Sequence, residues 1–211
     1  MSIERRSVLK GLALGSAALA LSQAGLAGAA QTAAAGTRKP VLVLLSDVDA
    51  QTAFMDGIKA NPGVSQVSLL STNHDLDFIA AFQKRLSTSK GERIIGLVDD
   101  ASGMLLLDLA RSAGAKVHWN GQHVTHKGVS RHRVSATDHS ANCIQQFAEF
   151  AGHCSRPSAM TEQTLSASRD WASSLGFALA SPDPSRRYLR TTPPTSSNAV
   201  DGHFVSFSIE T

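Results

Sequence analysis

Carboxylate and hydroxyl side chains gather directly after three short apolar segments of this 211-residue chain. Two carboxylates after the first segment and two after the third could together hold a hard cation such as Mg²⁺, which prefers oxygen ligands. Asp and Ser are also preferred N-cap residues of helices, and this structural interpretation is the favoured one. The candidate ligand-binding residues are Asp47, Asp49, Ser71, Asp99, Asp100 and Ser102, and the candidate catalytic residues are Asp47, Asp49 and Thr72.

Histidine and cysteine are concentrated in a second part of the chain. Six of the eight histidines and both cysteines lie between residues 118 and 154. Zinc and copper prefer imidazole and thiolate ligands, but these histidines lack close spacings such as an i,i+4 pair with a glutamate between. Two interpretations therefore stay open, scattered surface histidines and a transition-metal site. The first candidate ligands of such a site are His118, His123, His126 and His132.

The apolar segments have the length and pattern of buried strands. The run over 41–45 is continuous, which predicts a strand covered on both faces. Short connections between alternating strands and helices predict an α/β fold, with a parallel sheet in a three-layer core that is Rossmann-like or flavodoxin-like. Further strands are predicted at 64–70, at 93–98 and from 116, with helices at 49–60, at 75–86 and from about 100 to 114.

The predicted sheet brings the polar segments together. Ligands of open parallel sheets bind at the carboxyl ends of the strands, where the carboxylates and hydroxyls described above would lie. Trp119 follows His118 at the end of the fourth predicted strand and is the aromatic residue nearest to this edge. We therefore count Trp119 among the candidate ligand-binding residues.

The alternation stops after about residue 120. The segment 121–137 is polar and is predicted to hold a hairpin at Lys127-Gly128. Helices predicted at 140–151 and 161–180 form a C-terminal extension that begins at about residue 138. A proline-rich segment follows at 181–202, and the alternating residues 203–210 predict a final antiparallel strand at the edge of the sheet.

The first residues of the chain carry the most specific motif. Arg5-Arg6-Ser7-Val8-Leu9-Lys10 resembles the twin-arginine export signal of bacteria. An uncharged segment over 11–26 and the small residues Ala27-Gly28-Ala29 complete the pattern of a signal peptide that is cleaved after Ala29. The resemblance implies that the twin-arginine translocase is a partner during export and that the protein works in the periplasm. Proteins of this route cross the membrane folded, so a cofactor is permitted, although the sequence identifies none.

The predicted signal determines how the rest of the chain is divided. Residues 1–29 are the signal, residues 30–39 a linker rich in small residues, and residues 40–211 a single α/β domain. The apolar segment is short and diluted by glycine and serine, and no cysteine lies near the cleavage site, so we expect no permanent membrane anchor. The formal charge of +3 falls to about +1 when the signal leaves, and no basic run exists. Nucleic acid is therefore not an expected partner.

The two cysteines are predicted to form a disulfide in an exported protein. Their number is even, and the compartment is oxidising. In one unbroken helix, the eleven-residue separation of Cys143 and Cys154 would place their Cα atoms about 16 Å apart, too far for a bridge. Gly152 would therefore have to end the helix so that the chain folds back. A buried pair of free thiols is the alternative.

Two families resemble parts of the predicted domain. The segment Leu44-Leu45-Ser46-Asp47-Val48-Asp49 is similar to the nucleophile loop of haloacid-dehalogenase-like phosphatases. That resemblance implies Asp47 as nucleophile, Asp49 as acid/base, Thr72 as a phosphate contact, and Asp99 and Asp100 as ligands of Mg²⁺. The usual Gly-Thr after the second aspartate is Ala50-Gln51 here, and the lysine of the family has no clear counterpart.

The segment 91–117 is similar to part of one lobe of type I periplasmic solute-binding proteins, which are two-lobed and longer than this chain. This resemblance agrees with the predicted compartment. We therefore expect an exported protein that binds a small molecule or an envelope-protein partner. The two alternatives are a Mg²⁺-dependent phosphatase and a periplasmic metal-binding protein.

Overall fold

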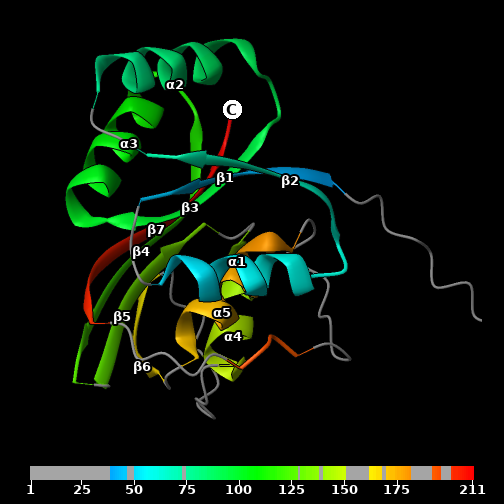
Figure 1. The fold of residues 1–211 in the computed structure, drawn as a ribbon, viewed down its shortest axis with the longest axis vertical. Helices are drawn as coiled ribbons and strands as arrows, with labels where there is room; N and C mark the ends of the chain where they lie inside the picture. Colours follow the sequence, from blue (N-terminus) through cyan, green and yellow to red (C-terminus); the bar gives the residue numbers. More distant parts are fainter. Residues whose placement is uncertain are drawn as a thin grey trace, which may run out of the picture. The chain divides into compact units, whose positions relative to one another are not determined.

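A mixed sheet forms the centre of the computed structural model, which describes residues 39–46, 50–72, 75–127, 129–137, 140–150, 162–167, 170–181, 192–195 and 201–211. These residues form seven strands in the order β2-β1-β3-β7-β4-β5-β6 (Figure 1). Strand β1 pairs in parallel with both β2 and β3, whereas the pairs from β3 through β7 to β6 are antiparallel. The strands are β1 (Lys39–Leu45), β2 (Val64–Ser71), β3 (Arg93–Asp99), β4 (Lys116–His126), β5 (Val129–Ala136), β6 (Glu162–Ala167) and β7 (Gly202–Glu210).

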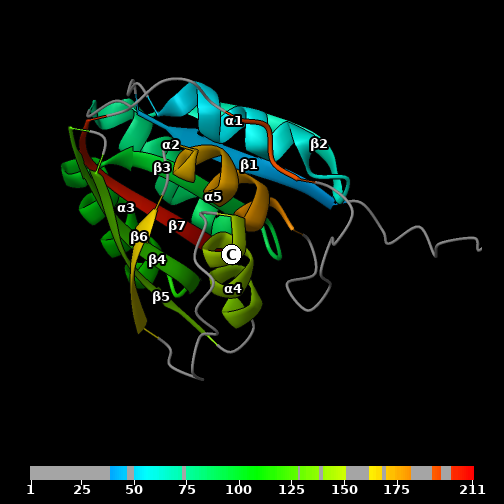
Figure 2. The ribbon, with the colours of Figure 1, turned by 90° about the horizontal axis from the view of Figure 1, so that it is seen from below.

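Helices cover both faces of the sheet (Figures 1 and 2). On one face, α2 (Leu76–Thr88) and α3 (Asp100–Ser112) bury Phe82 and Leu106 against the sheet. On the other face, α1 (Gln51–Ala60), α4 (Ala141–Phe150) and α5 (Trp171–Ala180) bury Phe54, Phe147 and Leu175. The predicted three-layer α/β architecture is therefore confirmed, and the helices of the predicted C-terminal extension lie in the same layer as α1.

Strand β1 explains how the two layers of core arise from one apolar run. Its side chains alternate, so that Val41, Val43 and Leu45 belong to the cluster under α1 and α5. Leu42 and Leu44 belong to the cluster under α2 and α3. All five are at most 3% exposed, which confirms the strand that was predicted to be covered on both faces.

The position of the last strand corrects one prediction. The alternating residues 203–210 predicted an edge strand, but β7 lies between β3 and β4 in the middle of the sheet. All six residues from 204 to 209 are buried. The prediction was wrong because the alternation of apolar and small polar residues does not require solvent on one face: Ser206 and Ser208 are buried on the side of α1, α4 and α5.

The predicted helix over 161–180 is also wrong in its first part. Residues Glu162–Ala167 form β6, which pairs with β5, and α5 begins only at Trp171. The helical spacing of Trp171, Leu175 and Leu179 identified a helix but not its limits, since every residue of α5 is buried. The predicted hairpin at Lys127-Gly128 is confirmed by β4 and β5, and the predicted helix over 140–151 is confirmed by α4.

Helix α5 packs against α1 through backbone rather than side chains. A Cβ atom on Gly57 would lie 2.0 Å from the carbonyl oxygen of Ser173, and one on Gly176 would lie 2.1 Å from that of Phe54. Glycine at both positions therefore lets the two helices come into direct contact. Although α5 is buried on all sides, none of the described helices is both long and apolar enough to span a lipid bilayer.

This contact yields a stability prediction. Alanine is favoured over glycine in helices by about 1 kcal/mol, but its Cβ would overlap fixed backbone atoms here. We therefore expect Gly57→Ala and Gly176→Ala each to lower the free energy of unfolding by about 1–3 kcal/mol in urea titrations. The exposed control Ser112→Ala should change it by less than about 0.5 kcal/mol. Unchanged stability of both glycine variants would contradict the direct helix contact.

Candidate functional site

The predicted ligand residues after β3 are brought together as a helix cap. One carboxylate oxygen of Asp99 accepts a hydrogen bond from the Ser102 backbone N–H at 2.9 Å, and the other accepts one from the Ser102 hydroxyl at 2.6 Å. The Asp99 N–H in turn donates to the Ser46 hydroxyl at 2.7 Å. These contacts make Asp99 the N-cap of α3 and join the ends of β1 and β3. The favoured structural interpretation is thus observed for these residues.

The other candidates at this edge are only partly described. Asp47 and Asp49 lie outside the described residues, so the phosphatase arrangement stays a prediction. Ser71 is opposite Leu45 in the sheet register, and the Thr72 N–H donates to the Leu45 carbonyl at 2.7 Å. Asp100 is exposed in the first turn of α3 and lines a small cleft of about 130 Å³. Among the described residues, no group of three or more His, Cys, Asp or Glu side chains is placed to hold a metal ion.

Two of the four candidate metal-ligating histidines meet in the core. His123 and His132 are opposite each other on β4 and β5, with their Nδ1 atoms 2.7 Å apart, and both are completely buried. The Trp171 ring covers both, with centroid distances of 5.0 and 4.9 Å. His126 lies at the far end of the hairpin and is exposed. Scattered surface histidines are therefore the wrong interpretation for this buried pair.

The buried pair belongs to a chain of polar side chains. The Trp119 Nε1–H donates to the Ser206 hydroxyl at 2.8 Å, and that oxygen lies 2.7 Å from His123 Nε2. Burial, and then the neighbouring His132, lower the pKa of His123 well below its ordinary value of 6.5. His123 is therefore neutral at pH 7, and a single proton lies between the two Nδ1 atoms, because one must donate and the other accept.

A larger cavity lies at the opposite edge of the sheet, where β1 and β3 begin and β7 ends. Its volume is about 450 Å³. The polar side chains that line it include Ser68, Lys90, Arg93, His118, Ser140 and Glu210. Since β4 runs in the same direction as β3, its first residues, and not its last, meet this edge.

Arg93 is the central cation of the cavity and is bound to neutral groups. Its guanidinium donates to the carbonyl oxygens of Leu179 and Ser181 at the end of α5, and its Nε lies 3.5 Å from the Ser208 hydroxyl. Burial lowers the pKa of Arg93, while the nearby Cys143 and Glu210 raise it. Among the described residues, no carboxylate is hydrogen-bonded to this guanidinium.

His118 reaches the cavity because β4 is irregular at this point. The pairing of β4 with β7 shifts register between Val117 and Trp119, and such bulges re-aim a side chain. The His118 Nε2 atom lies 2.9 Å from the Glu210 carboxylate, and its Nδ1 atom lies 3.1 Å from the Thr137 hydroxyl. The Thr137 hydroxyl, the His118 imidazole and the Glu210 carboxylate are therefore connected in a row beside the cavity.

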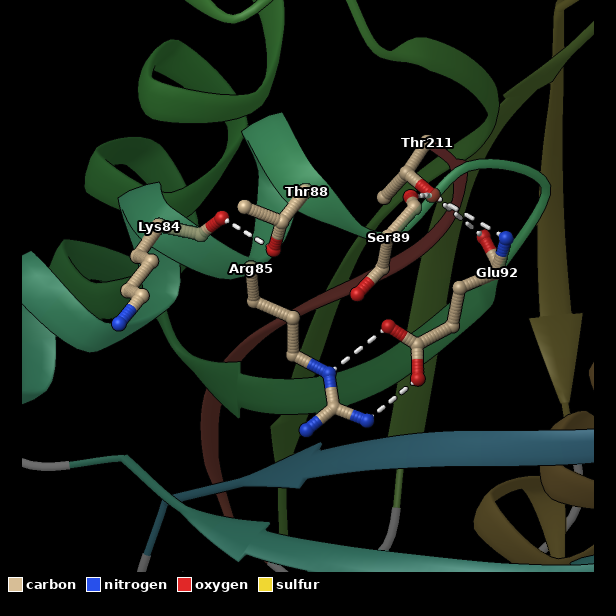
Figure 3. Close-up of polar contacts among 6 residues, drawn as sticks. All are labelled: Lys84, Arg85, Thr88, Ser89, Glu92 and Thr211. Carbon is tan, nitrogen blue, oxygen red and sulfur yellow. Dashed lines mark hydrogen bonds and ion pairs between the residues drawn. The ribbon is translucent and has the colours of Figure 1, made fainter.

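The rim of the cavity at residues 89–92 is held from two sides (Figure 3). Arg85 on α2 binds the Glu92 carboxylate through two of its nitrogens, one of them at 2.7 Å. The Thr211 hydroxyl donates to the Ser89 carbonyl and accepts a hydrogen bond from the Glu92 N–H at 3.1 Å. The backbone of Thr211 also pairs with Gly91 and Glu92. These contacts fix the rim between α2 and the last residue of the chain.

Two further predictions are corrected by the structure. Trp119 is completely buried near the start of β4, so it does not lie at the carboxyl edge with the other candidates. Cys143 is a free, buried thiol, so the predicted bridge to Cys154 is absent, and Cys154 itself lies outside the described residues. Helix α4 turns Cys143 into the core, where burial raises the pKa of its thiol to about 11.

Sequence reasoning missed Arg93, Glu210 and Thr137. It searched the carboxyl ends of the strands, whereas these residues lie at the other edge. A charged residue at the start of a buried strand, as Arg93 is in Arg93–Asp99, was the available signal. The partners of Arg93 are more than 80 residues away in the chain, so no local pattern could have revealed them.

The buried histidine pair makes stability depend on pH. The unfolded chain takes up protons as the pH falls below about 6.5, while His123 in the folded protein does not. The free energy of unfolding should therefore be constant above that pH and fall below it, by about 1.4 kcal/mol per pH unit for this residue. Urea titrations from pH 7.5 to 5 should show a shallower slope for His123→Gln and an unchanged slope for exposed His126→Gln. Equal slopes in all three proteins would contradict the assignment.

Comparison with protein-family models, with curated proteins and with solved structures found no match for this chain. The resemblances to phosphatases and solute-binding proteins therefore stay predictions.

Proposed function

We propose that the domain binds a small anionic molecule, most simply a carboxylate, in the cavity at the amino-terminal ends of β1 and β3. The observation that carries this proposal is the environment of Arg93. Its positive charge lies in the cavity wall, where its three hydrogen-bond acceptors are neutral carbonyl and hydroxyl oxygens. A guanidinium has five N–H donors, so donors remain for a ligand.

The other charges around the cavity support the same ligand chemistry. Glu92 is already bound by Arg85, and Glu210 by His118, so both carboxylates are engaged. Lys90 adds a second cation from the exposed rim. A ligand carboxylate would complete the charge balance, and charge-assisted hydrogen bonds to arginine are among the stronger polar contacts.

The size of the cavity agrees with a small ligand. A volume of about 450 Å³ lies within the usual range of about 300–1,000 Å³ for small-molecule sites. Ser68, Ser140 and Ser208 supply hydroxyl groups in its wall, next to the apolar residues Val41 and Leu42. This mixture is typical of sites that orient a ligand with a few polar groups.

We further propose that this binding takes place in the periplasm. The twin-arginine motif at Arg5 and Arg6, followed by an uncharged segment and small residues, supports export through the twin-arginine translocase. A binding or accessory role in the cell envelope fits this location. The ligand would then be a small molecule of that compartment.

A ligand screen by thermal unfolding tests the binding proposal. Small mono- and dicarboxylates should raise the melting temperature, whereas amines of the same size should not. At a concentration 100 times Kd, binding stabilises a protein by about 2.7 kcal/mol, or about 5–10 °C for a domain of this size. Absence of a shift with every carboxylate would contradict the proposal.

Two tryptophan variants locate the binding site. Ser68→Trp places a large ring in the cavity wall and should abolish the shift. Ser65→Trp, at an exposed position on the same strand but outside the lining, is the matched control and should retain the shift. If both variants keep the shift in melting temperature, or if both lose it, the ligand does not bind in this cavity.

Export has its own test in a bacterial host with the twin-arginine route. The wild-type chain should appear in the periplasm with the mass of residues 30–211. Changing both Arg5 and Arg6 to lysine should leave the full-length chain in the cytoplasm, while Arg38→Lys should have no effect. Normal export of the double variant would contradict the proposed route.

A further inference from the structure

We propose that Thr137, His118 and Glu210 form a hydrolytic centre that cleaves small carboxylic esters held in the cavity. This inference rests on the proposed binding function, since the same cavity would hold the substrate. It adds a chemical reaction to that site, in which Thr137 is the nucleophile, His118 the general base and Glu210 the group that orients the imidazole.

The distances match the requirements of nucleophilic catalysis. The Thr137 hydroxyl and His118 Nδ1 are 3.1 Å apart, and His118 Nε2 and the Glu210 carboxylate are 2.9 Å apart. Both distances lie within hydrogen-bond reach of a nucleophile, its base and the group that orients the base. Because a carboxylate can only accept, the Nε2 atom carries the proton and donates it to Glu210. The Nδ1 atom of the neutral ring is then free of a proton and accepts from Thr137.

The sheet holds the three residues in this order. Thr137 follows β5, His118 lies at the irregular start of β4, and Glu210 ends β7. The Thr137 N–H also donates to the His118 carbonyl at 3.0 Å, so backbone and side chain of these two residues are both connected. The His118 side chain is only 15% exposed, unlike that of a freely moving surface histidine.

The base and its partner face the cavity, and the nucleophile lies next to them at its edge. Thr137 is exposed, and both His118 and Glu210 contribute to the cavity lining. Arg93 and Lys90 line the same cavity, and their positive charge favours an ester oxygen that becomes negative during the reaction. Nucleophile and base are thus adjacent at the edge of a positively charged cavity wall.

The reaction proceeds in two balanced steps. First, the Thr137 oxygen bonds to the ester carbonyl carbon while its proton moves to His118 Nδ1. The bond to the alcohol oxygen then breaks, and His118 returns the proton to the leaving alcohol. Second, water attacks the acyl-threonine, again giving a proton to His118, which passes it to the departing Thr137 oxygen. The products are an alcohol and a carboxylic acid, and the acid is the class of ligand proposed for the cavity.

Hydrolysis of p-nitrophenyl acetate tests the proposal in the purified chain. We expect Thr137→Val and His118→Gln each to lower kcat/KM by about 100-fold or more, the usual contribution of a base to a proton transfer. Glu210→Gln should lower it by a smaller factor, and Thr137→Ser should retain turnover. Acid-quenched wild-type protein should carry an acetyl group on the peptide that contains Thr137, and Thr137→Val should not.

Matched controls separate this centre from unspecific surface reactivity. Thr52→Val and His126→Gln change exposed residues outside the cavity lining and should keep the wild-type rate. Wild-type turnover in Thr137→Val, or an acetyl group on another residue only, would overturn the proposal.

Carboxylate binding to Thr137→Val distinguishes the two proposals. Retained binding with lost turnover supports both. Wild-type protein that binds carboxylates but hydrolyses the ester no faster than Thr137→Val overturns the hydrolytic centre alone. Wild-type protein that neither binds nor hydrolyses overturns both proposals.

Discussion

The complete burial of α5 is the constraint on which the cavity and its charges depend. A helix end leaves carbonyl oxygens without partners, and each such group costs about 1–3 kcal/mol when it is buried. At the end of α5, Arg93 provides the partners by binding the carbonyls of Leu179 and Ser181. This need explains a buried arginine at the start of a core strand. It also leaves a positive charge facing neutral oxygens at the edge of the sheet.

The second feature that determines the arrangement of the cavity is the insertion of β7 between β3 and β4. Its Glu210 lies opposite Arg93 on one side and opposite Lys116 on the other. Its serines supply hydroxyls on the same face, where Ser208 approaches Arg93 and Ser206 joins Trp119 to the buried histidines. One strand therefore contributes polar groups both to the cavity and to the core. On this face of the sheet, Ser208 lies nearer the edge with the cavity, and Ser206 lies farther from it, beside the buried histidines.

The sequence predicted the parts of the fold that are determined locally. The apolar run of β1, the alternation up to α3, the hairpin at Lys127 and helix α4 all have patterns within a few neighbouring residues. The limits of β6 and the position of β7 depend on which strands pair with them. The sequence of one strand does not determine its pairing partners. The alternation of Phe207 with Ser206 and Ser208 was therefore assigned to an edge.

For the candidate site, the sequence identified candidate residues better than it predicted their positions in the fold. His118, His123 and His132 were singled out as candidate metal ligands, but the sheet buries two of them together and turns the third to the cavity. Asp99 and Ser102 were found and are explained by capping. The partners of Arg93 and Thr137 come from β4, β7 and α5, so the contacts of these two residues could not be predicted from their neighbours in the sequence.

The central position of β7 also affects how the chain can fold during synthesis. Strands β3 and β4 leave the ribosome long before residues 202–210, yet each needs β7 as its neighbour in the sheet. Until β7 has emerged, both strands present open edges, which are known starting points for aggregation. During synthesis, β3 and β4 therefore lack the strand that joins them in the sheet until residues 202–210 have been translated.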